Sequence, residues 1–214
     1  SGLAVMSYAT SLIQFPHGFV AVAISLAILP QLSAAFARGE SGAFARMLAR
    51  GLRLVAVLTL PAAVGMAVLS QPIVSAVYLH GAFNAASASA VSLALYGYLL
   101  GLPFASLDWP LNYAFYARQN TWVPAVVGVV AVVPYLAVAI AIGPVLNLGR
   151  LSPSTVFLGL VLADSAKQAS HAALMVVFAY RRIGRAAVEK LAVTLAASLA
   201  ASCGVGRGAA AAPN

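Results

Sequence analysis

Charged residues are scarce in this sequence. They make up 7% of its 214 residues, whereas hydrophobic residues make up 63%. Soluble domains usually contain about 25% charged and about 45–50% apolar residues. A water-soluble fold of this length has no means of burying so much apolar surface. The composition therefore excludes an ordinary soluble domain and predicts an integral membrane protein.

Acidic residues are rarer still. Four Asp and Glu residues oppose twelve Lys and Arg residues, which gives a net charge of +8. In a soluble protein this surplus would indicate a nucleic-acid partner. Here the basic residues lie between hydrophobic runs, and no basic run is interleaved with aromatic residues. We therefore expect membrane lipids as partners and no nucleic acid.

Cysteine and histidine are also rare, with a single cysteine, Cys203, and three histidines. One cysteine excludes an internal disulfide and a cysteine cage for a metal ion. The scattered histidines do not form a metal site, and the sequence has no phosphate-binding glycine loop, nucleophile elbow or HExxH motif. We expect no catalytic residue, no metal and no cofactor.

Long hydrophobic runs are abundant, and a membrane-spanning helix needs about 20 mainly apolar residues. Six stretches meet or approach this length, which predicts an all-α, polytopic transmembrane bundle without a soluble domain. The stretches are residues 3–36, 52–79, 86–116, 123–142, 155–180 and 191–203. Prolines within them, such as Pro16, tend to kink the helices. We expect the bundle to occupy residues 1–203 and residues 204–214 to form a disordered tail.

Basic residues collect in alternate loops between these stretches. The loops that carry them hold Arg38, Arg46, Arg50 and Arg53, then Arg118, then Arg181, Arg182, Arg185 and Lys190. The other loops hold only His80 and Arg150. Because basic loops stay on the cytoplasmic side, we expect a multi-pass protein of the inner (plasma) membrane with an external N-terminus.

Three of these arginines, Arg46, Arg50 and Arg53, have the spacing of residues that share one face of a helix. Two interpretations are open. The arginines anchor the helix to anionic lipid headgroups, or they form a site for a substrate phosphate.

Polar residues within the hydrophobic stretches are candidates for function, because charge at membrane depth is costly and usually faces the bundle interior. Asp164, Lys167 and His171 are spaced to share one helical face, which Gln168 extends. Either Asp164 and Lys167 neutralise each other and hold two helices together, or the stripe lines a hydrated cavity that meets an anionic substrate or a coupling ion.

Two further polar residues lie in hydrophobic surroundings. Asp108 is followed by Trp109 and Pro110, and the sequence leaves three roles open: a proton or sodium carrier, a hydrogen-bonding partner for another helix, or an interfacial residue. His17, between Pro16 and Gly18, is expected to be packed or to line a cavity, rather than to bind a metal.

Three groups of motifs together resemble the MurJ/MviN family of lipid II flippases, within the multidrug/oligosaccharidyl-lipid/polysaccharide exporter superfamily. They are YATSLIQFPHG at residues 8–18, then GLRL at 51–54 with LPAAVG at 60–65 and QPIV at 71–74, then FYARQNT at 115–121. The likeness covers most of residues 1–185, as helices eight to twelve of the family, and residues 191–203 look like a truncated thirteenth. The chain begins with Ser1-Gly2-Leu3, almost inside its first apolar run, and we expect it to be a piece of a longer protein.

The resemblance implies one lobe of a two-lobed, alternating-access flippase for a lipid-linked peptidoglycan precursor, lipid II, with the N-terminal lobe of the same protein as the missing partner. Alternatives are an exporter of another lipid-linked sugar or a drug, and a membrane scaffold that does not transport. The resemblance and the polar stripe give these candidate substrate-binding residues: Ser11, Gln14, His17, Arg53, Asp164, Lys167, Gln168 and His171.

The sequence departs from the family at two cavity positions. Family members usually carry an acidic residue and an arginine where this chain has Thr10 and Ser11. A lysine common in the family is Trp109 here. The resemblance therefore implies a weaker grip on a diphosphate in this lobe. Three interpretations are open: Lys167 or Arg53 substitutes, the substrate differs, or the protein is a degenerate paralogue.

Overall fold

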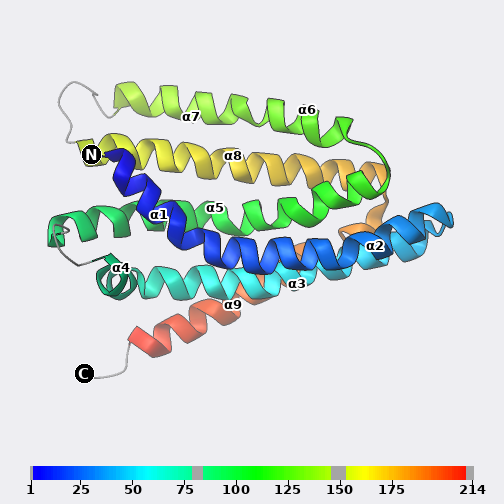
Figure 1. Ribbon diagram of the computed structural model, residues 1–214, viewed down its shortest axis with the longest axis horizontal. Helices are drawn as coiled ribbons and strands as arrows, with labels where there is room; N and C mark the ends of the chain where they lie inside the picture. The colour runs from blue at the N-terminus through cyan, green and yellow to red at the C-terminus, as the bar shows by residue number, and fades with distance from the viewer. Residues whose placement is uncertain (1, 79–83, 146–152, 211–214) are drawn as a thin grey trace.

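A computed structural model describes residues 2–78, 84–145 and 153–210, and within these ranges the regular structure is helical throughout. The long helices run side by side along one axis (Figure 1). In chain order the helical elements, with η marking a π-helical or 3-10 turn, are α1 Gly2–Pro16, η1 His17–Val22, α2 Ala23–Ala37, α3 Ser41–Val68, α4 Ser70–Tyr78, α5 Ala85–Ala117, α6 Trp122–Val130, α7 Val132–Val145, α8 Pro153–Arg182, η2 Arg185–Ala187 and α9 Leu191–Ala210. The predicted all-α bundle is confirmed.

Four helical stretches in the described part of the chain are long and apolar enough to cross a membrane: Ala4–Ala37, Ser41–Val68, Ala85–Ala117 and Trp122–Ala141. They correspond to four of the six predicted spans. Helix α8, with Asp164 and Lys167 in its middle, and α9 are not among the four. Their crossing of the membrane stays a prediction.

The second and sixth predicted segments differ from the structure at their boundaries. The second, residues 52–79, is two helices: α3 already begins at Ser41, and a break at Leu69 separates it from α4. The sixth, predicted to end at residue 203, continues to Ala210, so residues 204–210 of the predicted tail are helical. His80, Arg150 and residues 211–214 lie outside the described residues.

The first span changes its helical type at Pro16. Residues His17–Val22 form a π-helical turn, and the chain is α-helical on either side of it. Proline has no N–H to donate and its ring clashes with the carbonyl four residues before it. Such π-helical turns are often found at functional sites, and this one places His17 at the junction.

Helix α5 is the central helix of the bundle. In α5, 61% of the hydrophobic 18-residue stretch is buried inside the bundle. The corresponding share is between 22% and 39% in the other three candidate spans. One apolar core packs α2, α3 and α8 around its C-terminal half, and a second packs α1, α3 and α4 around its N-terminal half. Outward-facing side chains such as Phe15, Phe19 and Val129 are about 70% exposed, which suits a lipid-facing surface.

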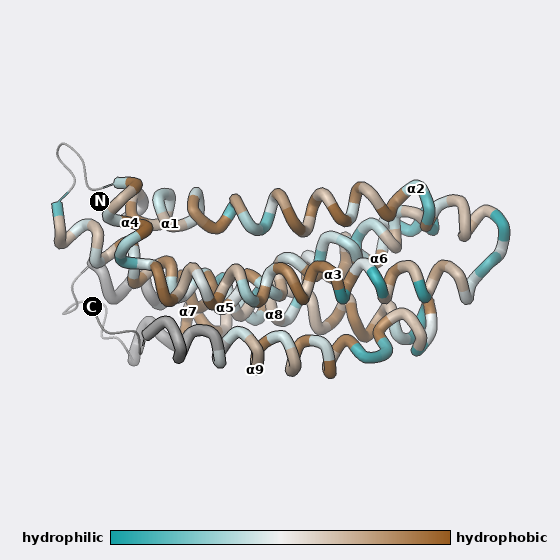
Figure 2. The backbone as a smooth tube through the Cα atoms, turned by 90° about the horizontal axis from the view of Figure 1, so that it is seen from below, coloured by the Kyte–Doolittle hydropathy of each residue, from teal (hydrophilic) through white to brown (hydrophobic). Residues whose placement is uncertain are grey.

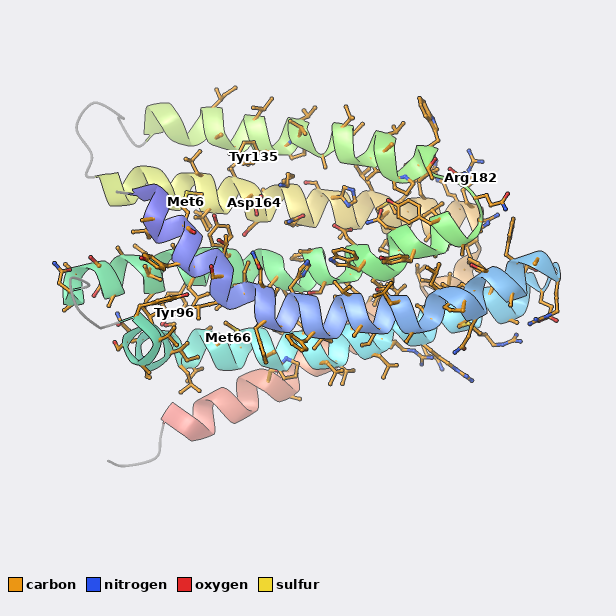
Figure 3. The ribbon with its side chains drawn as sticks, in the orientation of Figure 1. Met6, Met66, Tyr96, Tyr135, Asp164 and Arg182 are labelled. Carbon is orange, nitrogen blue, oxygen red and sulfur yellow. The ribbon has the colours of Figure 1, made fainter. Side chains whose placement is uncertain are left out.

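The basic loops meet at one end of the bundle. Helices α2, α5 and α8 all end there (Figure 1), and Arg118 contacts the backbone of Arg182, which Figure 3 labels at this end. Hydrophilic residues gather at the same end, around the α2–α3 turn, while the helix centres are mainly hydrophobic (Figure 2). The side of the membrane on which this end lies is the subject of a proposal below.

Candidate functional site

A polar cavity of 230 Å³ lies among α1, the π-helical turn η1, α5 and α8. Its polar lining residues are Thr10, Gln14, His17, Tyr98, Asp164 and Gln168. Four of them, Gln14, His17, Asp164 and Gln168, are candidates from the sequence. Thr10 and Tyr98 are not among the predicted substrate-binding residues, because neither residue type indicates a binding site by itself. The labelled view shows Asp164 on α8 at the level where α1 crosses (Figure 3).

His17 is held by two side chains of α5. The indole N–H of Trp109 donates to Nε2 of His17 over 2.8 Å, and Nδ1 of His17 lies 3.3 Å from the hydroxyl oxygen of Ser106. An imidazole nitrogen that accepts a hydrogen bond carries no proton. The ring is therefore neutral, with its proton on Nδ1, where it donates to Ser106. His17 both lines the cavity and ties η1 to α5.

Asp164 and Lys167 form an ion pair within α8. The Lys167 ammonium donates to Oδ1 of Asp164 over 2.8 Å, and both side chains are about one-third exposed. This agrees with mutual neutralisation. It does not support the idea that the pair holds two helices together, since both partners belong to one helix. Asp164 lines the cavity and Lys167 does not.

Asp108 and His171 form the contact between two helices that the sequence did not reveal. Nδ1 of His171 on α8 lies 2.9 Å from Oδ2 of Asp108 on α5, and both side chains are at least 85% buried. The approach is not aligned as a hydrogen bond, and Oδ1 of Asp108 has no hydrogen-bond partner within the described residues. Of the three roles open for Asp108, the geometry agrees with a contact to another helix, but not with the hydrogen bond that this role included.

A close approach of α5 and α8 sets the spacing of the cavity walls. The Ser165 hydroxyl donates to the carbonyl oxygen of Gly97 over 2.7 Å. A Cβ on Gly101 would lie 2.8 Å from Oγ and 3.0 Å from Cα of Ser165. Contacts that short require backbone movement, so Gly101 is needed for this approach.

Four predicted site residues lie apart from the cavity lining, and Lys167 is one of them. Ser11 is exposed on α1, and its hydroxyl donates to the carbonyl oxygen of Ser7 over 2.8 Å. Arg53 lies on α3, where Nε donates to the carbonyl oxygen of Ala49 over 3.2 Å. His171 also lies outside the lining, against Asp108. The structure thus splits the predicted set into four cavity residues and four residues elsewhere on α1, α3 and α8: Ser11, Arg53, Lys167 and His171.

A larger apolar groove of 620 Å³ lies on the other side of α5. Helices α3, α5, α8 and α9 form its walls, with residues such as Leu60, Leu100, Phe104, Leu195 and Leu199. The polar cavity uses a different set of α5 residues, including Tyr98 and Ala105. One helix therefore separates a polar hollow from an apolar one.

The family model for "Lipid II flippase MurJ" matches residues 1–211. The chain belongs to the MurJ family. A probable lipid II flippase MurJ from Rhizobium tropici is 35% identical over 182 residues, which cover 84% of this chain and 32% of that protein. A lipid II flippase MurJ from Burkholderia cenocepacia is 30% identical over 124 residues, 58% of this chain and 24% of that protein.

A solved structure agrees with the fold. The chain "Lipid II flippase MurJ, inward closed conformation" matches with a TM-score of 0.79 at 22% identity, over 99% of this chain and 41% of that chain. The MurJ-type membrane fold predicted from the motifs is confirmed. The chain spans about a third or less of the length of the MurJ relatives described above.

Proposed function

We propose that this chain forms part of a lipid II flippase and that its polar cavity meets the headgroup of the lipid-linked precursor. The observation that carries the proposal is the pairing of a polar cavity with an apolar groove on two sides of α5. A ligand with a polar head and a polyprenyl tail presents the same two chemistries. Family membership supports the same substrate class.

A polar stripe on α1 supports access to the cavity. Ser7, Ser11 and Gln14 follow each other at helical spacing and are exposed on an otherwise apolar helix. Polar side chains at membrane depth usually face protein or a water-filled space. We infer that this stripe borders the path of the headgroup, and that Ser11 acts there rather than inside the cavity.

The flippase mechanism in this proposal is alternating access, in which lobes rock around a central polar site. Helices that contribute to such a site are often interrupted there. The first span is interrupted by the π-helical turn His17–Val22, beside the cavity. The change in helical type therefore falls where the mechanism requires movement.

A second candidate, export of a less anionic lipid-linked glycan, is favoured by the cavity's charge. Neither Arg nor Lys is among the residues that line it in the described part of the chain, and its one carboxylate, on Asp164, is neutralised from outside by Lys167. A diphosphate is normally bound by cations. Neutral sugar hydroxyls are better matched to glutamine, histidine and tyrosine side chains.

Binding of lipid II to the purified chain tests the proposal. Lipid II and undecaprenyl phosphate share a tail and differ in headgroup, so their competition in native mass spectrometry isolates the polar cavity. We expect preferential retention of lipid II, reduced by Gln14→Leu and Gln168→Leu and unchanged by Gln31→Leu, an exposed control on α2. Equal retention of the two lipids in every variant would refute headgroup recognition, and preference for a sugar monophosphate lipid over both would favour the second candidate.

We also propose an inner-membrane location with the end around Arg118 and Arg182 in the cytoplasm, supported by the gathering of the basic loops at that end. Single cysteines at positions 46, 118 and 182 in a Cys203→Ala background should react only with membrane-permeant reagents in intact cells. Reaction of position 182 with an impermeant reagent from outside would reverse the orientation.

A further inference from the structure

A small basic cavity lies at the end of the bundle where the α2–α3 turn meets the C-terminal ends of α5 and α8. Its volume is 170 Å³, and its walls include Phe36, Ser41, Phe44, Arg118 and Arg182. We propose that this cavity binds a phosphate group carried by the headgroup of an anionic membrane lipid. The site is separate from the polar cavity and does not depend on the proposed flippase function.

Arg118 is fixed in position at this cavity. Its Nη1 donates to the backbone carbonyl oxygen of Arg182 over 2.7 Å, and its guanidinium carbon lies 5.9 Å from the centre of the Phe36 ring. A guanidinium has five N–H donors, and this is the one hydrogen bond that the Arg118 guanidinium makes within the described residues. The remaining donors are therefore held in place beside the cavity without a protein acceptor.

Arg182, 64 residues further along the chain, also lines this cavity and brings a second positive charge to this end of the bundle. Two like charges beside one small cavity favour an anion there. Arginine fits phosphate well, because its planar fork makes two parallel hydrogen bonds to phosphate oxygens. The two arginines are thus suited to binding the oxygens of one phosphate group.

Glu40, an acidic residue between the lining residues Gly39 and Ser41, is already paired. Its carboxylate accepts hydrogen bonds from Arg38, 2.7 Å from Nε and 3.2 Å from Nη2. The hydrogen bond from Arg38 lowers the pKa of the Glu40 carboxyl, so Glu40 stays ionised and paired. None of the described residues that line the cavity is acidic, and the two arginines are not neutralised there.

The size and surroundings of the cavity indicate a lipid as the source of the phosphate. A volume of 170 Å³ is below the roughly 300–1,000 Å³ of pockets for drug-sized ligands, which suits a single phosphate group. Tyr116, Trp122 and Tyr180 lie close in sequence to the two arginines and are between 45% and 75% exposed. Tyrosine and tryptophan gather at membrane–water interfaces, where basic pockets between helices bind lipid headgroups.

Lipid retention by the purified chain tests this site. Native mass spectrometry would compare phosphatidylglycerol with phosphatidylcholine at equal concentration. We expect preferential retention of phosphatidylglycerol, and about a fivefold loss of it in Arg182→Gln, the effect of one basic side chain near an anionic lipid. This variant keeps the backbone carbonyl that Arg118 uses, so the tie between α5 and α8 is preserved. Arg181→Gln, an exposed neighbour outside the lining, is the matched control.

Competition with inorganic phosphate distinguishes a phosphate carried by a lipid headgroup from free phosphate. Displacement of phosphatidylglycerol by phosphate, beyond that by chloride at equal ionic strength, would support the phosphate site and add free phosphate as a ligand. Equal losses of phosphatidylglycerol in Arg182→Gln and Arg181→Gln would overturn the proposal, because they indicate diffuse surface charge. Retention of both lipids to the same extent in the unmodified chain would overturn it as well.

Discussion

The hydrogen bond from Trp109 to His17 joins α5 to the π-helical turn of the first span over 2.8 Å. It uses Nε2 as acceptor, so His17 stays neutral while its Nδ1 faces Ser106. His17 also lines the polar cavity, so this hydrogen bond holds one wall of the cavity where the two helices meet.

Removing the indole donor should destabilise the bundle. Trp109→Phe keeps most of the ring volume but leaves Nε2 of His17 without its donor, and an unsatisfied buried acceptor costs about 1–3 kcal/mol. Equilibrium unfolding in detergent measures the loss. Trp122→Phe changes an indole that is 75% exposed and should have little effect. Equal losses in the two variants would show that the bond to His17 contributes nothing.

Asp108 and His171 should be energetically coupled across α5 and α8. In a double-mutant cycle of Asp108→Asn and His171→Gln, we expect a coupling free energy of about 0.6 kcal/mol and at most about 1.7 kcal/mol, the range found for polar pairs within membranes. The same cycle with Asp164→Asn in place of Asp108→Asn is the control. It should be additive, because Asp164 is paired with Lys167.

Asp164 and Lys167 should compensate for each other. Either single change, Asp164→Asn or Lys167→Gln, leaves one charge without its partner 2.8 Å away, whereas the double change removes both. We therefore expect a larger folded amount of the double variant than of either single variant, measured by size-exclusion chromatography after extraction. If the double variant folds well but loses ligand binding, Asp164 has a role in the cavity beyond the ion pair.

Gly101 should tolerate no side chain. Gly101→Ala places a methyl group 3.0 Å from Cα of Ser165, and overpacking of this kind costs typically about 1–3 kcal/mol. Gly65→Ala on α3 has no atom within 4 Å of the new methyl group and should be neutral or slightly stabilising. Comparable unfolding curves for the two variants would contradict the close packing of α5 against α8.

The fold could be predicted from the sequence because the length of an apolar stretch decides whether a helix can span a membrane. Residues 86–116 were predicted almost to the end points of Ala85–Ala117. The predicted apolar span began at residue 52, whereas α3 begins at Ser41 and carries Arg46 and Arg50, whose spacing had already indicated a helix. Arginine is a good helix former, so charge marks the end of the lipid-facing surface and not the end of the helix.

The site followed only in part. Spacing along α8 correctly paired Asp164 with Lys167, three residues apart. Spacing also grouped His171 with them, although His171 contacts Asp108, which lies 63 residues earlier, on α5. Helical periodicity orders residues on one helix and contains no information on which residue of a neighbouring helix each one meets. The same limit hid the hydrogen bond between His17 and Trp109.

Transfer of lipid II across the membrane is the most direct measurement. This chain would replace the matching part of the Rhizobium tropici protein, which is 35% identical over 182 residues, in cells depleted of their own flippase. The proposed function predicts that the chimera restores growth and exposes lipid II to an externally added cleaving enzyme. A chimera that reaches the membrane in normal folded amount yet leaves lipid II on the inner leaflet would contradict it.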